Sequence, residues 1–480
     1  MRRWLAAALL GAGSLAASAQ SLDEALEGFG ETPAVTLANP ATPAAEDPAG
    51  ELSGSLALSA SYNYRDHVSA NGTDWQGLSK LRTRLNLQYE QPLAEQWQFR
   101  VAGYGFYDAA YSLRERDEYS ADVLDAYEHE AEWQEVWLRG KLRDDVDLKV
   151  GRQVVNWGRA DSLRVLDVLN PLDNREPGLT DIEDIRLPVT MLKTDWFFAQ
   201  RWQASFMAMP EMRFSRNPPY GSDFAVPLSL APTGNIALRL DEDEPEHVAD
   251  TAFAAAITGT FSGWDISFHA ADLWRDTPYL RVNGPYTLAL PSVAQQLEMA
   301  HSRYTLFGAG GNYIRGSWLF KAEVAWLDGI DVTLAAPVAV PLLGVLELPV
   351  ANTQKSRIDV LAGIEYFGIG NTTLSLEIAN RHFVDYEPAM APLYQQQDAL
   401  ETALRYTGTF IHDRLEVTAL AIALGDRAQD GALLRLQAAY DIRDALVLTV
   451  GVVDYRHGDL PPFTIAENND RLFAEIKYSF

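Results

Sequence analysis

The sequence predicts an all-β protein: a transmembrane, antiparallel, up-and-down β-barrel of about 18 strands, with 16 as the alternative. Three observations predict this fold class. The chain ends in an amphipathic strand, most of its length is divided into short segments of alternating polarity, and the connections between these segments alternate between short and long. Beyond the N-terminus, no apolar run reaches the roughly 18 residues of a membrane-spanning helix. Closed barrels are the other structure that satisfies every backbone group in lipid.

The last ten residues, 471–480, follow a two-residue period. One side of this period carries Leu472, Ala474, Ile476, Tyr478 and Phe480, and the other carries Arg471, Glu475, Lys477 and Ser479. An amphipathic strand that ends on a terminal aromatic residue resembles the assembly signal of bacterial outer-membrane barrels. The resemblance implies the cell outer membrane of a Gram-negative bacterium, recognition by the barrel-assembly machinery through Phe480, and contact with outer-membrane lipids and lipopolysaccharide.

The N-terminus has the pattern of a secretory signal peptide. Arg2 and Arg3 precede an apolar run, and the small residues of Ala17-Ser18-Ala19 follow it as a cleavage site. We therefore predict a signal peptide at residues 1–19, a periplasmic N-terminal segment with an Ala/Pro-rich linker at 20–50, and the barrel at 51–480.

Composition excludes several classes of protein. The formal net charge of −27 argues against nucleic acid as a partner, because phosphates are bound by lysine and arginine. The chain has 0 cysteines, which excludes disulfides and thiolate metal sites, and we expect neither a cofactor nor a metal. The acidic run at 241–246 is interpreted as a solvated loop surface, with bridging of divalent cations at the lipopolysaccharide surface as the alternative.

Eighteen strands are expected along the chain. They span 52–64, 78–90, 95–107, 131–142, 146–155, 189–199, 201–212, 250–261, 263–274, 303–314, 316–327, 355–368, 370–381, 400–411, 413–425, 431–442, 444–455 and 470–480. The expected long connections are 108–130, 156–188, 213–249, 275–302, 328–354 and 382–399. Outer-membrane barrels sort their connections in this way, with short periplasmic turns and long extracellular loops.

Aromatic residues near the ends of these strands fit the two interfacial girdles of a barrel. The set is Tyr62, Tyr64, Tyr89, Trp97, Tyr107, Trp196, Trp202, Trp264, Trp274, Trp318, Trp326, Tyr440, Tyr455 and Tyr478. Ordinary β-propensity also favours aromatic residues and is the alternative explanation.

If the apolar alternate of each strand faces lipid, its polar neighbours face the lumen. A charge on the lipid face near mid-bilayer costs about 2–4 kcal/mol, which turns these residues inward. The expected lumen residues are Arg82, Arg84, Asn86, Gln88, Arg100, Asp147, Lys149, Lys321, Glu323, Glu365, Glu377, Arg381, Arg405, Glu416, Arg435, Gln437, Asp441, Glu475 and Lys477. Both signs occur without a decisive imbalance, so a mutually neutralising wall network is as consistent with the pattern as an ion-selective channel.

One connection carries a motif. It contains Val150-Gly151-Arg152-Gln153-Val154-Val155-Asn156-Trp157-Gly158-Arg159, then Asn170-Pro171-Leu172-Asp173, Pro177-Gly178 and Leu187-Pro188-Val189. This order resembles an uncharacterised family of proteobacterial outer-membrane proteins, a domain of unknown function similar in architecture to alginate-export-type barrels. The resemblance implies, as partners, a resistance-nodulation-division (RND) exporter and a small outer-membrane lipoprotein. It supplies no catalytic residues, and Arg159 stands where the family usually has Glu.

The same connection is dense in charge and long enough to be functional. We predict that 156–188 folds into the barrel mouth as a constriction or plug. The candidate lumen and constriction residues are Arg152, Trp157, Arg159, Arg164, Asp167, Arg175, Asp184 and Arg186, with Arg82, Arg84 and Arg100 on the wall. Arginine and carboxylate can pair in bidentate fashion and hold irregular backbone. An external loop held by salt bridges is the alternative.

The function predicted from these features is transport. A lumen lined by charged and polar residues offers a water-filled path for small polar or amphiphilic solutes, and the resemblance adds an RND-type exporter. A structural or adhesin-type barrel with acidic loops is the alternative, and a barrel-embedded lipid-active hydrolase is a third. The sequence contains no G-x-S-x-G or H-E-x-x-H motif, so we predict that the protein is not an enzyme.

Overall fold

The computed structural model describes residues 50–69, 71–94, 96–179, 185–225, 232–233, 236–237, 242–243, 250–284, 297–340, 344–466 and 468–480. The predicted signal peptide, residues 20–49 and Asp184 lie outside the described residues, as do the side chains of the acidic run at 241–246. Predictions about these parts of the chain therefore stay predictions.

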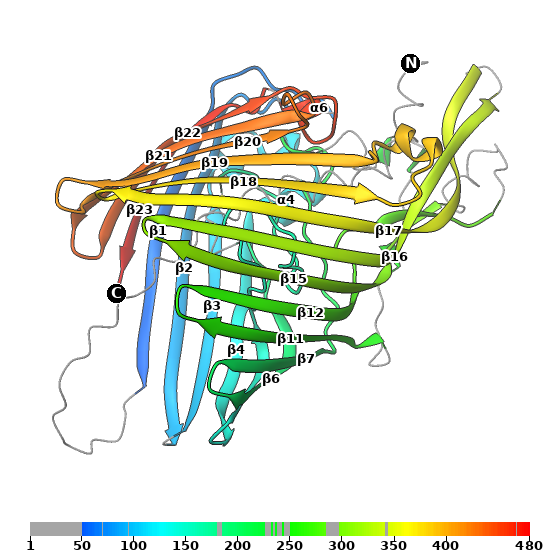
Figure 1. The fold of residues 1–480 in the computed structure, drawn as a ribbon. Helices are drawn as coiled ribbons and strands as arrows, with labels where there is room; N and C mark the ends of the chain where they lie inside the picture. Colours follow the sequence, from blue (N-terminus) through cyan, green and yellow to red (C-terminus); the bar gives the residue numbers. More distant parts are fainter. Residues whose placement is uncertain are drawn as a thin grey trace.

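Eighteen antiparallel strands form one closed sheet (Figure 1). They are β1 (Glu51–Asn63), β2 (Gly77–Ala94), β3 (Trp97–Asp108), β4 (His129–Arg143), β5 (Val146–Gln153), β6 (Val189–Ala199), β7 (Trp202–Met209), β11 (Ala252–Phe261), β12 (Trp264–Trp274), β15 (Arg303–Arg315), β16 (Trp318–Val340), β17 (Gly344–Ile369), β18 (Thr372–Phe383), β19 (Asp398–Phe410), β20 (Leu415–Leu424), β21 (Gly431–Arg443), β22 (Leu446–Arg456) and β23 (Arg471–Ser479).

Each strand pairs with its sequence neighbour, and β1 closes the barrel by pairing with β23 as well as with β2. The closing ladder runs from Asn63↔Arg471 to Ser55↔Ser479. The predicted class and the count of eighteen are confirmed, and every predicted strand span falls on one of these strands. The first strand begins and the last strand ends on the side of the short turns, which is the periplasmic end in outer-membrane barrels.

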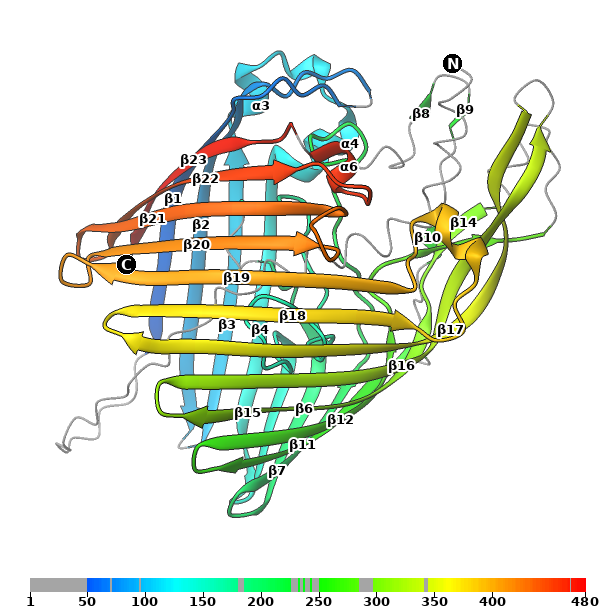
Figure 2. The same ribbon diagram turned by 45° about the horizontal axis from the view of Figure 1, so that its top comes forward.

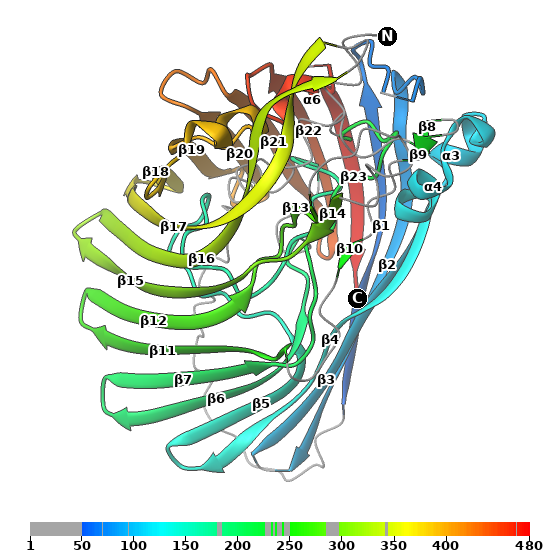
Figure 3. The ribbon, with the colours of Figure 1, turned by 90° about the vertical axis from the view of Figure 1, so that its right-hand side faces the viewer.

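The long connection predicted at 328–354 is wrong as a loop, because the strands continue through most of it. β16 and β17 extend beyond the barrel as a paired ribbon that rises above the rim (Figure 3). Register shifts after Leu327 and Leu334, and Gly329 with its φ of +89°, bend the ribbon while the ladder continues. Val332 and Leu348 are buried within it.

The other long connections carry short elements that the sequence analysis did not predict. These are α3 (Ala110–Leu113), η1 (Arg116–Glu118), α4 (Ala121–Tyr127), β8 (Pro232–Thr233), β9 (Ile236–Ala237), β10 (Glu242–Asp243), β13 (Tyr279–Val282), β14 (Leu297–Ala300), η4 (Pro388–Leu393) and α6 (Phe463–Ala466). Ser120 caps α4 by accepting the Val123 N–H at 3.3 Å. Among the described residues no helix has the length and apolarity needed to cross a membrane.

The outer face of the barrel is apolar. Leucine, isoleucine and phenylalanine side chains such as Leu56, Phe253 and Ile476 are about half exposed on it, and exposed tryptophan and tyrosine lie towards the strand ends. Tyr455 is the exception in the predicted girdle. It faces the lumen, is 2% exposed and donates to the Pro177 carbonyl, because Val453 and Tyr455 occupy the inward alternate of β22.

The lumen is less polar than predicted. Buried loop residues such as Leu163 and Leu166 pack inside the barrel with inward-facing wall residues, among them Leu306, Leu420 and Leu433. The extracellular half of β20 is apolar on both faces, so its inward alternate adds to this core. Water therefore does not line the whole wall, and part of the lumen is a packed hydrophobic core.

Candidate channel site: the loop inside the barrel

The connection between β5 and β6 lies inside the ring of strands (Figure 2), and we call its described residues, 154–179 and 185–188, the inner loop. Its backbone is held by inward-facing side chains from strands on the far side of the barrel, more than 150 positions away in the sequence. The loop therefore crosses the lumen.

Glu323 of β16 is the first anchor of the inner loop. Its carboxylate accepts the backbone N–H groups of Arg159, Ala160 (3.1 Å) and Leu166 (2.9 Å). The side chain is only 4% exposed, so each of these bonds replaces a bond that water would otherwise make. One carboxylate thus holds both ends of the turn 159–166.

Glu377 of β18 is the second anchor. It accepts the N–H groups of Asp161 (2.8 Å), Ser162 (2.8 Å) and Leu163 (3.1 Å), and its side chain is fully buried. Lys321 of β16 lies 3.7 Å from Glu377 and also pairs with Asp161. The two glutamates together satisfy six backbone donors, so loop and wall are joined by charge-assisted hydrogen bonds.

Between these anchors the wall leaves space for one apolar side chain. Gly308 and Gly310 face the lumen from β15, and Leu166 lies against both. A Cβ added to Gly310 would lie 2.9 Å from Leu166 Cδ1, and one added to Gly308 would lie even closer to Cδ2. The absence of two side chains on β15 is therefore what allows the loop to approach.

Asp167 organises the interior of the loop. It accepts the backbone N–H of Trp157 at 3.0 Å and pairs with Arg186 at 3.1 Å and with Arg164 at 3.6 Å. The Trp157 ring is buried edge-on against His269 of β12, with ring centroids 4.7 Å apart. The start and the end of the loop are thereby joined through one buried carboxylate.

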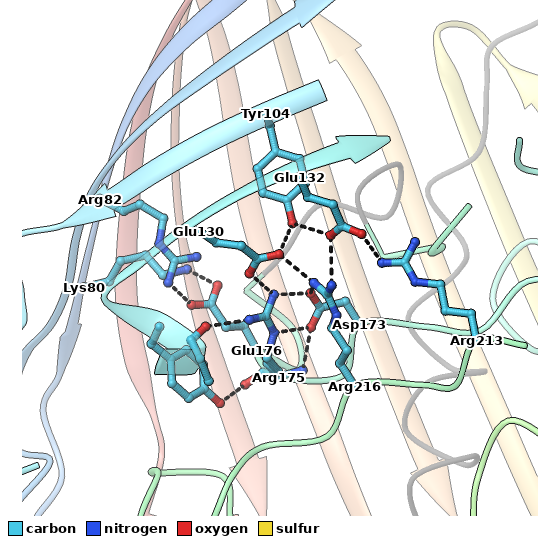
Figure 4. A network of polar contacts seen from close by, with 12 residues as sticks. Lys80, Arg82, Tyr104, Glu130, Glu132, Asp173, Arg175, Glu176, Arg213 and Arg216 are labelled. Atoms are coloured by element: carbon cyan, nitrogen blue, oxygen red, sulfur yellow. Dashed lines mark hydrogen bonds and ion pairs between the residues drawn. The ribbon is translucent and has the colours of Figure 1, made fainter. Parts of the chain in front are cut away.

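The far part of the loop inserts into a second network, against β2–β4 (Figure 4). Arg175 makes a bidentate pair with Asp173, at 2.8 and 2.5 Å, and its Nη2 lies 2.8 Å from Glu130 of β4. Burial lowers the pKa of Arg175, but Asp173 and Glu130 outweigh it and hold the pKa well above its usual value. The arginine therefore stays charged inside the barrel.

Glu176 is the neighbouring anion in this network. It pairs with Lys80 and, at 2.7 Å, with Arg82, both on β2. Burial raises the pKa of the Glu176 carboxyl, but Arg82 and Lys80 outweigh burial and hold the pKa well below its usual range. Figure 4 shows these three side chains converging from strand and loop.

A second extracellular connection completes the network. Arg216 lies 2.6 Å from Glu130 and 3.0 Å from Glu132, and Arg213 pairs with Glu132 as well. Tyr104 of β3 donates to Glu130 at 2.7 Å. Sequence analysis missed these residues, because nothing in the local pattern shows that the chain after β7 returns to β4.

The predicted constriction residues fall into separate groups. Trp157, Arg159, Arg164, Asp167 and Arg186 lie together against β12–β18, where Arg159 Nε lies 2.8 Å from Asp265. Their assignment to the narrowest point of a channel stays a prediction.

The remaining predicted residues lie elsewhere. Arg175 lies with Arg82 in the network of Figure 4, and Arg152 lies at the extracellular end of β5 and pairs with Glu211. Further down the wall, Arg84 lies 4.1 Å above the Tyr104 ring, and Arg100 pairs with Glu90 at 3.1 Å. Asp184 is outside the described residues.

A small cavity of about 40 Å³ lies on the extracellular side of the inner loop. Its wall combines the guanidinium groups of Arg164, Arg275 and Arg357 with the phenol of Tyr304. The other lining residues are Val165, Asp167, Val168, Asp276, Leu327, Ile330 and Asp359.

Solved structures share this architecture at low sequence identity. OccAB2 of Acinetobacter baumannii aligns with a TM-score of 0.50 and 10% identity over 90% of this chain and 98% of its own. OccAB3 of the same organism aligns with a TM-score of 0.50 and 13% identity over 90% of this chain and 99% of its own. OccAB1 aligns with a TM-score of 0.50 and 11% identity over 90% of this chain and 96% of its own. At such identities the likeness establishes the fold, an outer-membrane β-barrel. No curated protein sequence matches the chain.

The family assignment is direct. The model of the family described as "Protein of unknown function (DUF1302)" matches residues 2–480, so nearly the whole sequence is covered. A closed barrel with an apolar outer face belongs in the outer membrane, which agrees with the family suggested by the 150–189 motif. The protein is an outer-membrane β-barrel that belongs to the DUF1302 family.

Proposed function

We propose that the protein is a channel that moves small polar or amphiphilic solutes across the outer membrane, and that the inner loop sets the width of its path. The single observation that supports this most strongly is the attachment of the loop to Glu323 and Glu377. Six backbone donors bound to two buried carboxylates hold a segment across the lumen at defined positions. A barrel that served only as a membrane anchor would not need such a device.

The lining of the lumen supports a cargo with both polar and apolar parts. Charged wall residues such as Arg84 and Lys477 occupy the inward alternate of their strands, and the partly buried Leu179 and Phe473 add apolar side chains to the same hollow. Polar groups keep such a path hydrated, and apolar strips accept the rest of an amphiphile.

Planar-bilayer recording tests the proposal. The purified protein should give stepwise conductance, and deletion of 160–183 should raise the single-channel value, because the segment crossing the lumen is removed. Assembly is checked by the shifted electrophoretic migration of the folded barrel. A correctly assembled protein without conductance would rule out the channel, and an unchanged conductance after the deletion would rule out the loop as its constriction.

The alternatives predict different results in the same preparation. An adhesin-type barrel would be sealed and would bind an external partner, whereas a barrel-embedded hydrolase would be sealed and would release fatty acid from added phospholipid. The proposed partners, an RND-type exporter and a small lipoprotein, rest on the family resemblance. In-cell crosslinking from the periplasmic turns, for example at Asp144, tests them: failure to capture either partner would remove them from the proposal.

A further inference from the structure

A recess interrupts the outer face of the barrel on β6, β7, β11, β12 and β15, which are consecutive strands of the wall (Figure 1). Its volume is about 440 Å³, and its lining is almost entirely apolar. We call it the outer recess. The outward-facing residues that line it are Leu192, Thr194, Phe206, Ala208, Phe253, Ala255, Ala270, Asp272, Thr305 and Phe307.

The strand register explains why the outer recess exists. Ala255 of β11 is the partner of Ala270 of β12. The same row of the sheet continues to Phe206 of β7 on one side and to Phe307 of β15 on the other. Because neighbouring strands lie about 4.8 Å apart, β7 and β15 are separated by about 14 Å. Two methyl side chains therefore form a floor between two phenyl rings.

The outer recess lies in the extracellular half of the wall. Ala255 is the fourth residue of β11 and Ala270 the fifth from the end of β12, and both positions are near the extracellular ends of these strands. At that end Arg303 pairs with Asp272 at 2.9 and 3.1 Å and lies 5.6 Å from the Trp274 ring centroid. Tryptophan and arginine are typical of the headgroup level. The recess therefore begins just below the headgroups and faces the hydrocarbon of the outer leaflet.

Packing decides whether a lipid chain stays at such a place. Within a bilayer no hydrophobic driving force acts between apolar groups, so close contact holds a chain against protein. A flat wall contacts a chain on one side only. The outer recess adds contacts from the rings of Phe206, Phe253 and Phe307, which are 52–54% exposed and are free to pack against an incoming chain.

We propose that the outer recess is a binding site for one fatty-acyl chain of a lipopolysaccharide molecule. The outer face of the barrel is its interface with lipid, and the depth of the recess places it against the outer leaflet, which lipopolysaccharide forms. Arg303 and Asp272 neutralise each other at its extracellular end, so the site selects the chain and not the charge of a headgroup. This proposal is independent of transport through the lumen and goes beyond the proposed function.

Native mass spectrometry of the detergent-solubilised full-length protein tests the proposal. Protein purified from the outer membrane should retain lipopolysaccharide, and delipidated protein should bind added lipid A. Ala255→Leu combined with Ala270→Leu fills the outer recess and should lower the lipid-bound fraction by about threefold or more, because the chain loses its packing contacts. The single variant Ala255→Leu serves if the double variant does not assemble.

Ala322→Leu combined with Ala362→Leu is the matched control. These two alanines are also partners on neighbouring strands, β16 and β17, but both are exposed on the outer face of the wall. The control should bind lipid A as the wild type does. An equal loss in the control would show that any added bulk on the outer face disturbs lipid binding, and it would overturn the site.

Other results of the same experiment would also overturn the proposal. One is equal lipid retention by the filled and the wild-type proteins. Another is retention of phospholipid in place of lipopolysaccharide. A third is a wild-type oligomer that dissociates when the recess is filled, which would assign the recess to contact with a second copy of the chain. None of these results depends on conductance.

Discussion

At the scale of single residues, the inward-facing glutamates have the clearest physical role. Sequence analysis placed Glu323 and Glu377 in the lumen, with a mutually neutralising wall network and an ion-selective channel as the two explanations of the lumen charges. In the structure the ion pair between Glu377 and Lys321 is long, at 3.7 Å. The Glu377 carboxylate instead accepts hydrogen bonds from three backbone N–H groups of the inner loop. A local pattern cannot reveal this role, because an amide donor is present at nearly every residue.

Glu377→Ala should lower the free energy of unfolding by about 3 kcal/mol or more, because three buried N–H groups lose their acceptor and each costs about 1–3 kcal/mol. Glu377→Gln should cost about half as much, since one acceptor oxygen remains. Denaturant unfolding of the detergent-solubilised barrel measures both. Glu416→Ala, on the lumen wall near the periplasmic end, is the control and should stay close to wild type. If alanine at 377 behaves like alanine at 416, the anchoring role is wrong.

Glu176 predicts a pH dependence of stability. Burial raises the pKa of the Glu176 carboxyl, but the charges of Arg82 and Lys80 lower it by more, so the pKa in the folded protein is below its usual value. The stabilising contribution is therefore complete above the unfolded pKa of about 4.3, and it is lost as pH falls through the lower folded value. The thermal midpoint of wild type should drop on acidification below about pH 4. The thermal midpoint of Glu176→Gln should drop less over the same pH range. An equal dependence of the thermal midpoint on pH in both proteins would contradict the depressed pKa of Glu176.

At the scale of elements, the inner loop and strand β15 are matched in shape. Gly308 and Gly310 provide the space that Leu166 occupies. Two glycines in a strand predict either a weakened strand or the close approach of another segment, but the local pattern does not identify that segment. The partner lies about 140 positions earlier in the chain, so only the closed barrel identifies it.

Gly308→Val should destabilise the barrel by about 1–3 kcal/mol although valine favours strands, because its side chain would displace Leu166 from a packed site. The displaced loop should also broaden the distribution of single-channel conductance levels. Gly370→Val is the control, since a Cβ at that turn position meets open space. A stabilised Gly308→Val barrel with wild-type conductance would show that Leu166 is not held there.

The extracellular ribbon shows where element boundaries depend on more than pattern. β16 continues to Val340 and β17 begins at Gly344, so the strands run through a stretch, 328–354, in which only Asp328, Asp331 and Glu347 carry charge. The expectation of a loop came from the periodic spacing of long connections, which is an average property of barrels. The ladder continues because each strand finds its partner on the other arm of the same hairpin.

At the scale of the whole molecule, closure depends on the chain ends. Phe480 and Gly54 exchange two backbone hydrogen bonds, at 2.8 and 2.9 Å, beside the β1–β23 ladder. Closure removes the free edges of the sheet, which is the condition for a sheet to exist in lipid. The terminal residue therefore contributes to the final seam as well as to the predicted assembly signal.

Deletion of Phe480 should reduce the amount of folded barrel in the outer membrane by several-fold, whereas Phe410→Ala, at the periplasmic end of β19, should assemble normally. Membrane fractionation and the migration shift of folded protein provide the measurement. Full assembly of the truncated chain would show that recognition by the assembly machinery does not need the terminal aromatic.

Sequence alone determined the wall of this protein. Alternation at a period of two, the sorting of short and long connections and the ending on Phe480 are local properties, and they were sufficient for an eighteen-stranded outer-membrane barrel. Tertiary structure decided which segment occupies the lumen inside this wall. The bonds between Glu323 and Ala160, or Glu377 and Ser162, join residues more than 160 positions apart, and no periodicity specifies them. Closing the cylinder brings these groups within reach, and burial then requires each polar group to find a partner.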